Sequence, residues 1–75
     1  MLGTLDSLEV GERAVVTAIY GRDDMKRRLL DIGMTQGLEL TCVLKSPFGD
    51  PKAYWIKGAT IALRNEDAEN VMIEK

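Results

Sequence analysis

The sequence predicts a mainly β domain, a small, partly open barrel of about five short strands with one inserted α-helix. Short stretches of alternating apolar residues recur along the chain, and a single stretch has the three-to-four-residue spacing of a helix. Closing the sheet would remove free edges, which in short β domains favour aggregation. With 75 residues, the chain is expected to form one domain (1–75) that buries about 60% of its unfolded surface. A deep catalytic cavity is therefore not expected.

The N-terminal half begins with a polar lead-in. Leu5 and Leu8 stand among polar residues, and we expect them to cover one end of the core, although no pattern defines the backbone of residues 1–12. Residues 13–20 are rich in β-branched side chains and form the first predicted strand. Both faces of this strand are largely apolar, which is expected where one face meets the core and the other meets the helix.

A helix is predicted to follow and to run to about Ile32. Met25, Leu29 and Ile32 recur at i, i+4 and i+7 and therefore share one helical face. Asp23 or Asp24 is the expected N-cap, and acidic residues in a first turn also suit the helix dipole.

The helix is predicted to end at a glycine. Gly33 follows the last periodic residue, where a helix commonly finishes in a left-handed conformation. Met34 has the spacing of an apolar residue that folds back onto the helix end. Gly37 provides a second turn before the next strand.

The second predicted strand covers residues 38–45 and alternates clearly. A reactive thiol would need basic neighbours or further ligands, which the surrounding sequence does not supply, so the single cysteine is interpreted as a small core hydrophobe. The alternation places four residues on the buried face: Leu38, Leu40, Cys42 and Leu44.

The C-terminal part is predicted to be a tight hairpin of two strands, 53–57 and 60–64, followed by a short turn at 65–68 and a last strand at 71–73. Trp55 is expected to face outward or to lie against the helix. The residues expected to face inward are Tyr54, Ile56, Ile61, Leu63, Val71 and Ile73.

Lys26, Arg27 and Arg28 form the one basic cluster. The cluster is either a site for an acidic partner or a phosphate, or a solvated face that pairs with nearby acids. The second interpretation predicts ion pairs at i,i+4, each contributing a few tenths of a kcal/mol. These pairs are Asp23–Arg27, Asp24–Arg28 and Arg27–Asp31.

The loop at 46–51 contains two prolines and a glycine, which stiffen it. Phe48 is expected at its tip. An aromatic residue there either anchors a partner or folds down to cap an open end of the barrel.

Composition disfavours several classes of function. The chain has no histidine and one cysteine, so it lacks the commonest general base, and it carries no phosphate-binding or dinucleotide motif. No catalytic, cofactor-binding or metal-binding residue is therefore assigned, and an enzyme is not expected.

A net charge of −2 argues against a nucleic-acid binder, for which Phe48 and Trp55 would be the only obvious stacking residues. With no disulfide possible, and neither a signal peptide nor a spanning segment visible, a cytoplasmic location is expected.

Three motifs together resemble the FeoA family, small cytoplasmic accessory proteins of ferrous iron transport. They are RLLDIGMTQG at 28–37, SPFGDP at 46–51 and KGATIALRNEDA at 57–68, in the family's order and spacing. The resemblance implies an SH3-like barrel with a helix after the first long strand. It also implies a partner, FeoB, a membrane ferrous iron transporter with a cytoplasmic G-domain.

The resemblance thus implies a module that binds and regulates the transporter, with Arg22 or Arg28 as a candidate GTPase-activating finger. The alternative is a free-standing metal-responsive domain like the C-terminal domain of iron-dependent repressors, although this chain lacks the histidines such a domain would supply. A spare strand edge would also permit a homo-oligomer. The candidate partner-binding residues are Arg28, Met34, Gln36, Phe48, Gly49 and Asp50.

Overall fold

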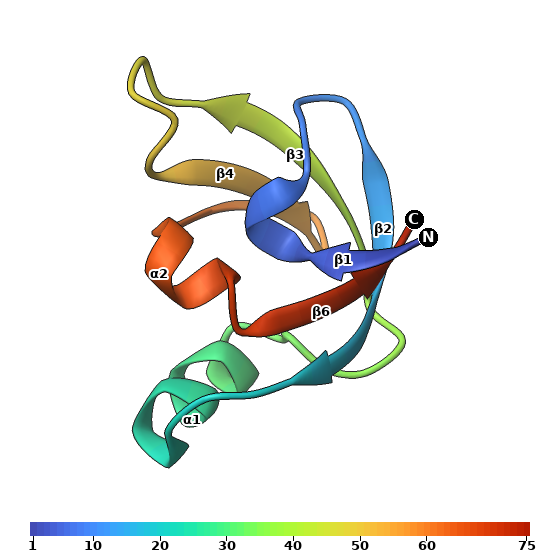
Figure 1. Cartoon of the computed structure of the whole chain (residues 1–75), viewed down its shortest axis with the longest axis vertical. Coiled ribbons are helices and arrows are strands. Elements are labelled where there is room, and N and C mark those ends of the chain that lie inside the picture. Colours follow the sequence, from blue (N-terminus) through green and yellow to red (C-terminus); the bar gives the residue numbers. More distant parts are fainter.

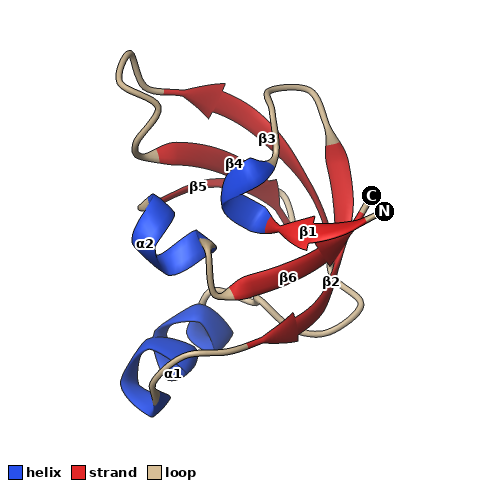
Figure 2. Cartoon of the chain, in the orientation of Figure 1, coloured by secondary structure: helices blue, strands red, loops and turns tan.

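Six antiparallel strands form one strongly curved sheet in the order β1-β6-β2-β3-β4-β5, which confirms the mainly β prediction (Figures 1 and 2). The computed structural model describes all 75 residues. The strands are β1 (Leu2–Thr4), β2 (Arg13–Ile19), β3 (Glu39–Lys45), β4 (Lys52–Ile56), β5 (Ala59–Leu63) and β6 (Val71–Glu74). The helices are the 3-10 turn η1 (Leu5–Ser7), α1 (Asp23–Asp31) and α2 (Asn65–Ala68). Neither α-helix has the length and apolar character needed to cross a membrane.

The N-terminal strand β1 lies within residues 1–12, for which the sequence predicted no secondary structure. In β1, Leu2 is paired with Glu74 and Thr4 with Met72 of β6. The two chain ends lie side by side (Figure 1), and the amide of Lys75 donates to the carbonyl of Met1 at 2.9 Å. β1 was missed because it is three residues long and is stabilised by a partner some 70 positions away in the sequence.

The core lies inside the curved sheet, and Ile61 and Leu63 of β5 are only partly buried against it. Leu5 and Leu8 are both completely buried, as predicted, and so is Tyr54, whose hydroxyl donates to the carbonyl of Leu5 at 3.4 Å. Trp55 faces outward and is half exposed. The buried cluster consists of Leu5, Leu8, Ala14, Val16, Leu29, Met34, Leu38, Leu40, Cys42, Tyr54, Ile56, Ala68, Val71 and Ile73.

The predicted inward orientation of Leu44 is wrong. Leu44 is 63% exposed, whereas Cys42 is completely buried. The pairing of β3 with β4 shifts between these two residues, because Cys42 faces Tyr54 while Leu44 faces Ala53. A bulge at this point adds one residue to β3 and inverts the alternation beyond it.

The predicted N-cap of the helix is also wrong. Arg22 occupies that position without a side-chain cap, and Asp23 and Asp24 are the first two helical residues. The Asp24 carboxylate accepts a hydrogen bond from the amide of Met25 at 2.9 Å. The acidic pair therefore stabilises the first turn, and its negative charge also suits the helix dipole.

The C-terminal end of α1 confirms the predicted glycine stop. Gly33 has φ +93°, and its amide donates to the carbonyl of Leu30 at 2.9 Å. The amide of Met34 donates to the carbonyl of Leu29 at 3.0 Å, which completes a Schellman motif. Met34 thereby turns back beneath the helix and into the core.

Gly33→Ala is expected to reduce the free energy of unfolding by about 1–2 kcal/mol, because a Cβ is disfavoured in the left-handed region. The added carbon would also lie 3.4 Å from Cδ of Lys57. Urea unfolding monitored by circular dichroism measures the change. Gly3→Ala is the matched control, because Gly3 lacks a positive φ and its Cβ would lie 3.5 Å from the Ser7 hydroxyl. Equal stability of both variants would contradict the assignment of strain to Gly33.

The one buried charged residue, Lys52, was not singled out from the sequence. It opens β4, is 6% exposed, and points towards η1. Its ammonium group donates to the carbonyl of Asp6 at 2.5 Å and to that of Leu8 at 3.0 Å. Lys52 therefore ties the N-terminal segment to the sheet with charge-assisted hydrogen bonds.

Candidate functional site

The six predicted partner-binding residues do not form one surface. Arg28 lies on α1, and Gln36 lies in the turn that follows this helix, whereas the 46–51 loop joins β3 to β4. Figure 1 shows α1 and this loop at opposite ends of the molecule's longest axis. A partner would therefore bind one of these ends or wrap along the whole domain.

Met34 is part of the core and not of a binding surface. Its side chain is completely buried beneath the end of α1. The prediction that Met34 contacts a partner is incompatible with this burial, because the Schellman turn directs the side chain inward.

The 46–51 loop divides into an exposed tip and a base that is hydrogen-bonded to the start of α2. Phe48 is 96% exposed, so the alternative in which it caps the barrel is wrong, and its role as an anchor stays a prediction. The Asp50 carboxylate accepts a hydrogen bond from the amide of Asn65 at 3.0 Å. The Gly49 carbonyl accepts one from the side-chain amide of Asn65 at 3.1 Å. Gly49 and Asp50 thus hold the start of α2, whereas the Phe48 side chain extends into solvent.

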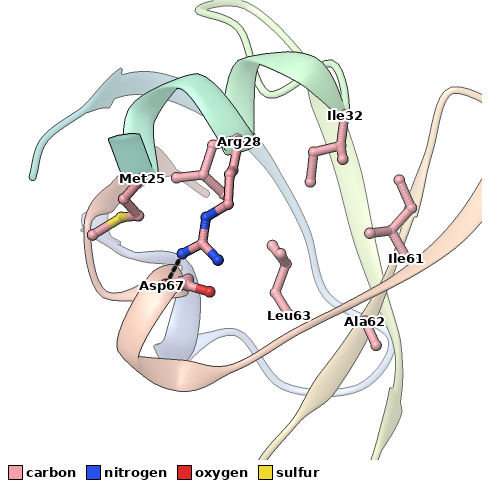
Figure 3. A pocket seen from close by; sticks show the side chains of 8 residues that line it. Met25, Arg28, Ile32, Ile61, Ala62, Leu63 and Asp67 are labelled. Atoms are coloured by element: carbon pink, nitrogen blue, oxygen red, sulfur yellow. Dashed lines mark hydrogen bonds and ion pairs between the residues drawn. The ribbon is translucent and has the colours of Figure 1, made fainter. Parts of the chain in front are cut away.

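An apolar groove of about 180 Å³ separates α1 from β5 (Figure 3). At one end, Arg28 pairs with Asp67 of α2 across 3.5 Å, and this arginine side chain stays 71% exposed. The apolar walls come from the inner face of the helix and from the strand. The lining residues are Met25, Arg28, Leu29, Ile32, Ile61, Ala62, Leu63 and Asp67.

A second depression, of about 380 Å³, lies on the other side of α1, against β2. Gln36 and Thr35 form one wall, and Leu30, which is 52% exposed, forms another. The depression is more polar than the groove beside β5. Arg28 and Gln36 therefore belong to two different hollows on opposite sides of the same helix.

None of the three predicted i,i+4 ion pairs on α1 forms. Instead, Arg22 pairs with Asp24 at 3.2 Å, while Arg28 reaches across to Asp67. The hydrogen bond from Arg22 lowers the pKa of the Asp24 carboxyl below its usual range. Lys26, Arg27, Asp23 and Asp31 make no ion pair within 4 Å, so these charges of α1 are left to solvent.

No group of three or more metal-ligating side chains lies together in the structure. Cys42 is buried, and burial raises the pKa of its thiol, so the thiolate is scarce at neutral pH.

Alkylation of Cys42 in the folded protein is therefore expected to be slower than in the unfolded chain by about a hundredfold or more, since reaction requires opening of the core. The measurement is the iodoacetamide rate at pH 8, with the urea-unfolded protein as the reference. A native rate equal to the unfolded rate would contradict the buried position.

The family model described as the FeoA domain matches residues 3–75, which is nearly the whole chain. The chain belongs to the FeoA family. It is 34% identical over 70 residues to the Fe(2+) transport protein A/Fe(2+) transporter FeoB fusion protein of Porphyromonas gingivalis. That match covers 93% of this chain but only 8% of the relative, so this FeoA chain corresponds to a small part of the fusion protein.

Solved structures agree with the fold. The FeoA-like protein from Clostridium acetobutylicum superposes with a TM-score of 0.90 at 27% identity, covering 97% of this chain and 85% of that one. FeoA from Stenotrophomonas maltophilia, a prokaryotic SH3 domain protein solved with zinc, superposes with a TM-score of 0.82 at 31% identity. This second match covers 95% of our chain and 88% of the other. The predicted SH3-like class is thereby confirmed.

Proposed function

We propose that this FeoA-family protein is a non-enzymatic, cytoplasmic accessory protein of ferrous iron uptake that binds and regulates a FeoB-type membrane transporter. The observation that carries this proposal is the fusion of a 34% identical domain to FeoB in P. gingivalis. A fusion holds two domains at a high effective concentration, which is useful when their separate counterparts bind one another. The small core and the absence of histidine leave protein contact as the favoured mode of action.

The end of the molecule that carries α1 supports such binding better than the rest of the surface. It has a hollow on each side of the helix, lined in part by Arg28 and by Gln36 respectively. Apolar walls with a polar rim are typical of the contact regions of protein complexes. Phe48 provides a separate exposed aromatic anchor at the opposite end.

The proposed regulation includes stimulation of GTP hydrolysis by the transporter's G-domain. Arg22 and Arg28 are the candidate activating residues, and each is already paired with a carboxylate, at 3.2 and 3.5 Å. Either arginine would have to leave its acidic partner before it could stabilise charge on a transferring phosphoryl group. Arg28→Lys retains the charge but loses the bidentate geometry, so we expect it to lower any stimulation of hydrolysis by about tenfold or more. Phosphate release from the transporter's G-domain measures this effect, and stimulation that is unchanged in both Arg28→Lys and Arg22→Lys would contradict an arginine finger.

The proposal is tested by amide NMR spectra of this protein during addition of the cytoplasmic G-domain of its cognate transporter, with and without a GTP analogue. We expect shifts that cluster around α1 and residues 33–37, with a further set near Phe48 if the loop takes part. Gln36→Ala is a suitable probe variant, because its site lies beside an open hollow. Absence of any shift, followed by absence of binding to the intact transporter, would reject the proposal.

A further inference from the structure

We propose that the free edge of β5 accepts an extended segment of the partner as an additional antiparallel strand, with an apolar side chain in the α1–β5 groove and an acidic side chain near Lys57. This inference rests on the proposed function, since the segment is assigned to the transporter. It specifies how the partner binds, which neither the fold nor the family match describes.

The first support is a row of unpaired backbone groups. β5 ends the sheet and is paired only with β4. Ile56 and Ala59 face each other across a two-residue turn whose residues both have positive φ, so they form the hydrogen-bonded pair that closes the hairpin. Since hydrogen-bonded and non-hydrogen-bonded pairs alternate along the ladder, Thr60 and Ala62 direct their N–H and C=O groups outward.

These outward groups have no other backbone partner. None of the backbone hydrogen bonds made by turns, loops and caps involves Thr60 or Ala62. Both residues are exposed, so the edge is accessible to another chain. An unpaired edge is a template for strand addition, and peptide-binding domains use such edges to bind extended segments.

The second support is the groove beside this edge. Its lining includes the consecutive residues Ile61, Ala62 and Leu63 of β5, and α1 forms the facing wall (Figure 3). At about 180 Å³ the groove is smaller than the 300 Å³ or more typical of small-molecule sites, and it suits individual side chains of a peptide. An extended segment can contact both walls of the groove. Its backbone would pair with β5, and alternate side chains would contact the apolar face of α1.

The charges at the two ends indicate the chemistry of the segment. Beside α2, Arg28 is matched by Asp67, so this end is already neutralised. At the hairpin end, Lys57 extends along Gly33 and makes no ion pair within 4 Å. An acidic residue of the partner would complement Lys57.

The experiment combines hydrogen exchange of the wild-type protein with binding of variants to the purified cognate transporter in lipid nanodiscs. In the free protein, we expect the amides of Thr60 and Ala62 to exchange quickly, and those of Ile61 and Leu63 slowly. Addition of the transporter is expected to slow exchange at Thr60 and Ala62 by about tenfold or more.

Ala62→Pro removes the outward N–H but no bond to β4, and proline is tolerated on edge strands in this orientation. We expect this variant to bind about tenfold more weakly, because one backbone hydrogen bond is lost and the ring blocks close approach. Ala62→Thr retains the amide and the strand propensity, so it is the matched control and is expected to bind like the wild type. Lys57→Glu is expected to weaken binding by a similar factor.

The outcomes distinguish this inference from the proposed function. Binding of the transporter without protection of Thr60 and Ala62 would overturn strand addition and leave the proposed function standing. Protection that depends on protein concentration without the transporter would assign the edge to a second copy of this chain and overturn the partner named here. Absence of any binding would overturn both, and the exchange measurement on the wild type stays decisive even if Ala62→Pro fails to fold.

Discussion

Replacement of Met34 by alanine is expected to lower the free energy of unfolding by about 2–5 kcal/mol. The side chain is completely buried, and it fills the space between the helix end and the sheet. Its removal reduces the buried apolar surface and leaves a cavity. The backbone cannot collapse into this cavity, because the Schellman turn holds it in place. In a small domain of marginal stability, this loss is enough to populate the unfolded state. Chemical unfolding followed by far-ultraviolet circular dichroism provides the measurement.

Two variants separate packing from binding at this position. Met34→Leu conserves volume and is expected to cost less than about 1.5 kcal/mol. Leu30→Ala removes a side chain from the same helix end that is 52% exposed, so its effect on stability should be small. A Met34→Ala protein that keeps full stability and loses only partner binding would show that Met34 belongs to a binding surface after all.

Replacement of Lys52 by methionine is expected to cost about 2–4 kcal/mol, because two carbonyls then lose their donor in a buried setting. Methionine matches the length of the aliphatic stem, so the loss is mainly one of hydrogen bonding. The carbonyls of Asp6 and Leu8 lie at 2.5 and 3.0 Å from the ammonium group, and Leu8 itself is completely buried. Hydrogen exchange should show the N-terminal segment opening first, followed by a lower thermal midpoint of the whole domain.

The control for this prediction is Lys45→Met, which removes an exposed lysine with only a 3.8 Å contact to Glu9. Exposed ion pairs contribute little, so this variant should stay within about 1 kcal/mol of the wild type. Equal effects of the two substitutions would mean that Lys52 contributes through general charge and not through its carbonyl partners.

Local features of the fold were predictable from the sequence. The helical face of Met25, Leu29 and Ile32, the stop at Gly33 and the hairpin between β4 and β5 all depend on residues within a few positions of one another. The burial of Cys42 was likewise evident from strand alternation. Side-chain periodicity and glycine conformations act at this range, so one sequence is enough to detect them.

The candidate site was predicted only in part. Arg28, Gln36 and Phe48 are exposed or line a hollow, but the sequence could not show that the helix end and the 46–51 loop lie at opposite ends of the molecule. Nor could it show that Gly49 and Asp50 accept hydrogen bonds from Asn65. These facts depend on which strands become neighbours in the sheet.

The class of fold, the helix α1 with its glycine stop and, through three motifs, the family were thus predictable from the sequence, whereas the start of α1 was not. The exposure of Leu44, the burial of Lys52 and the position of the free β5 edge beside a groove below α1 became evident only from the tertiary structure. The physical reason is the range of the interactions. Alternation and capping act between near neighbours, whereas a bulge, a buried ammonium group or an open strand edge depends on backbone groups contributed by distant parts of the chain.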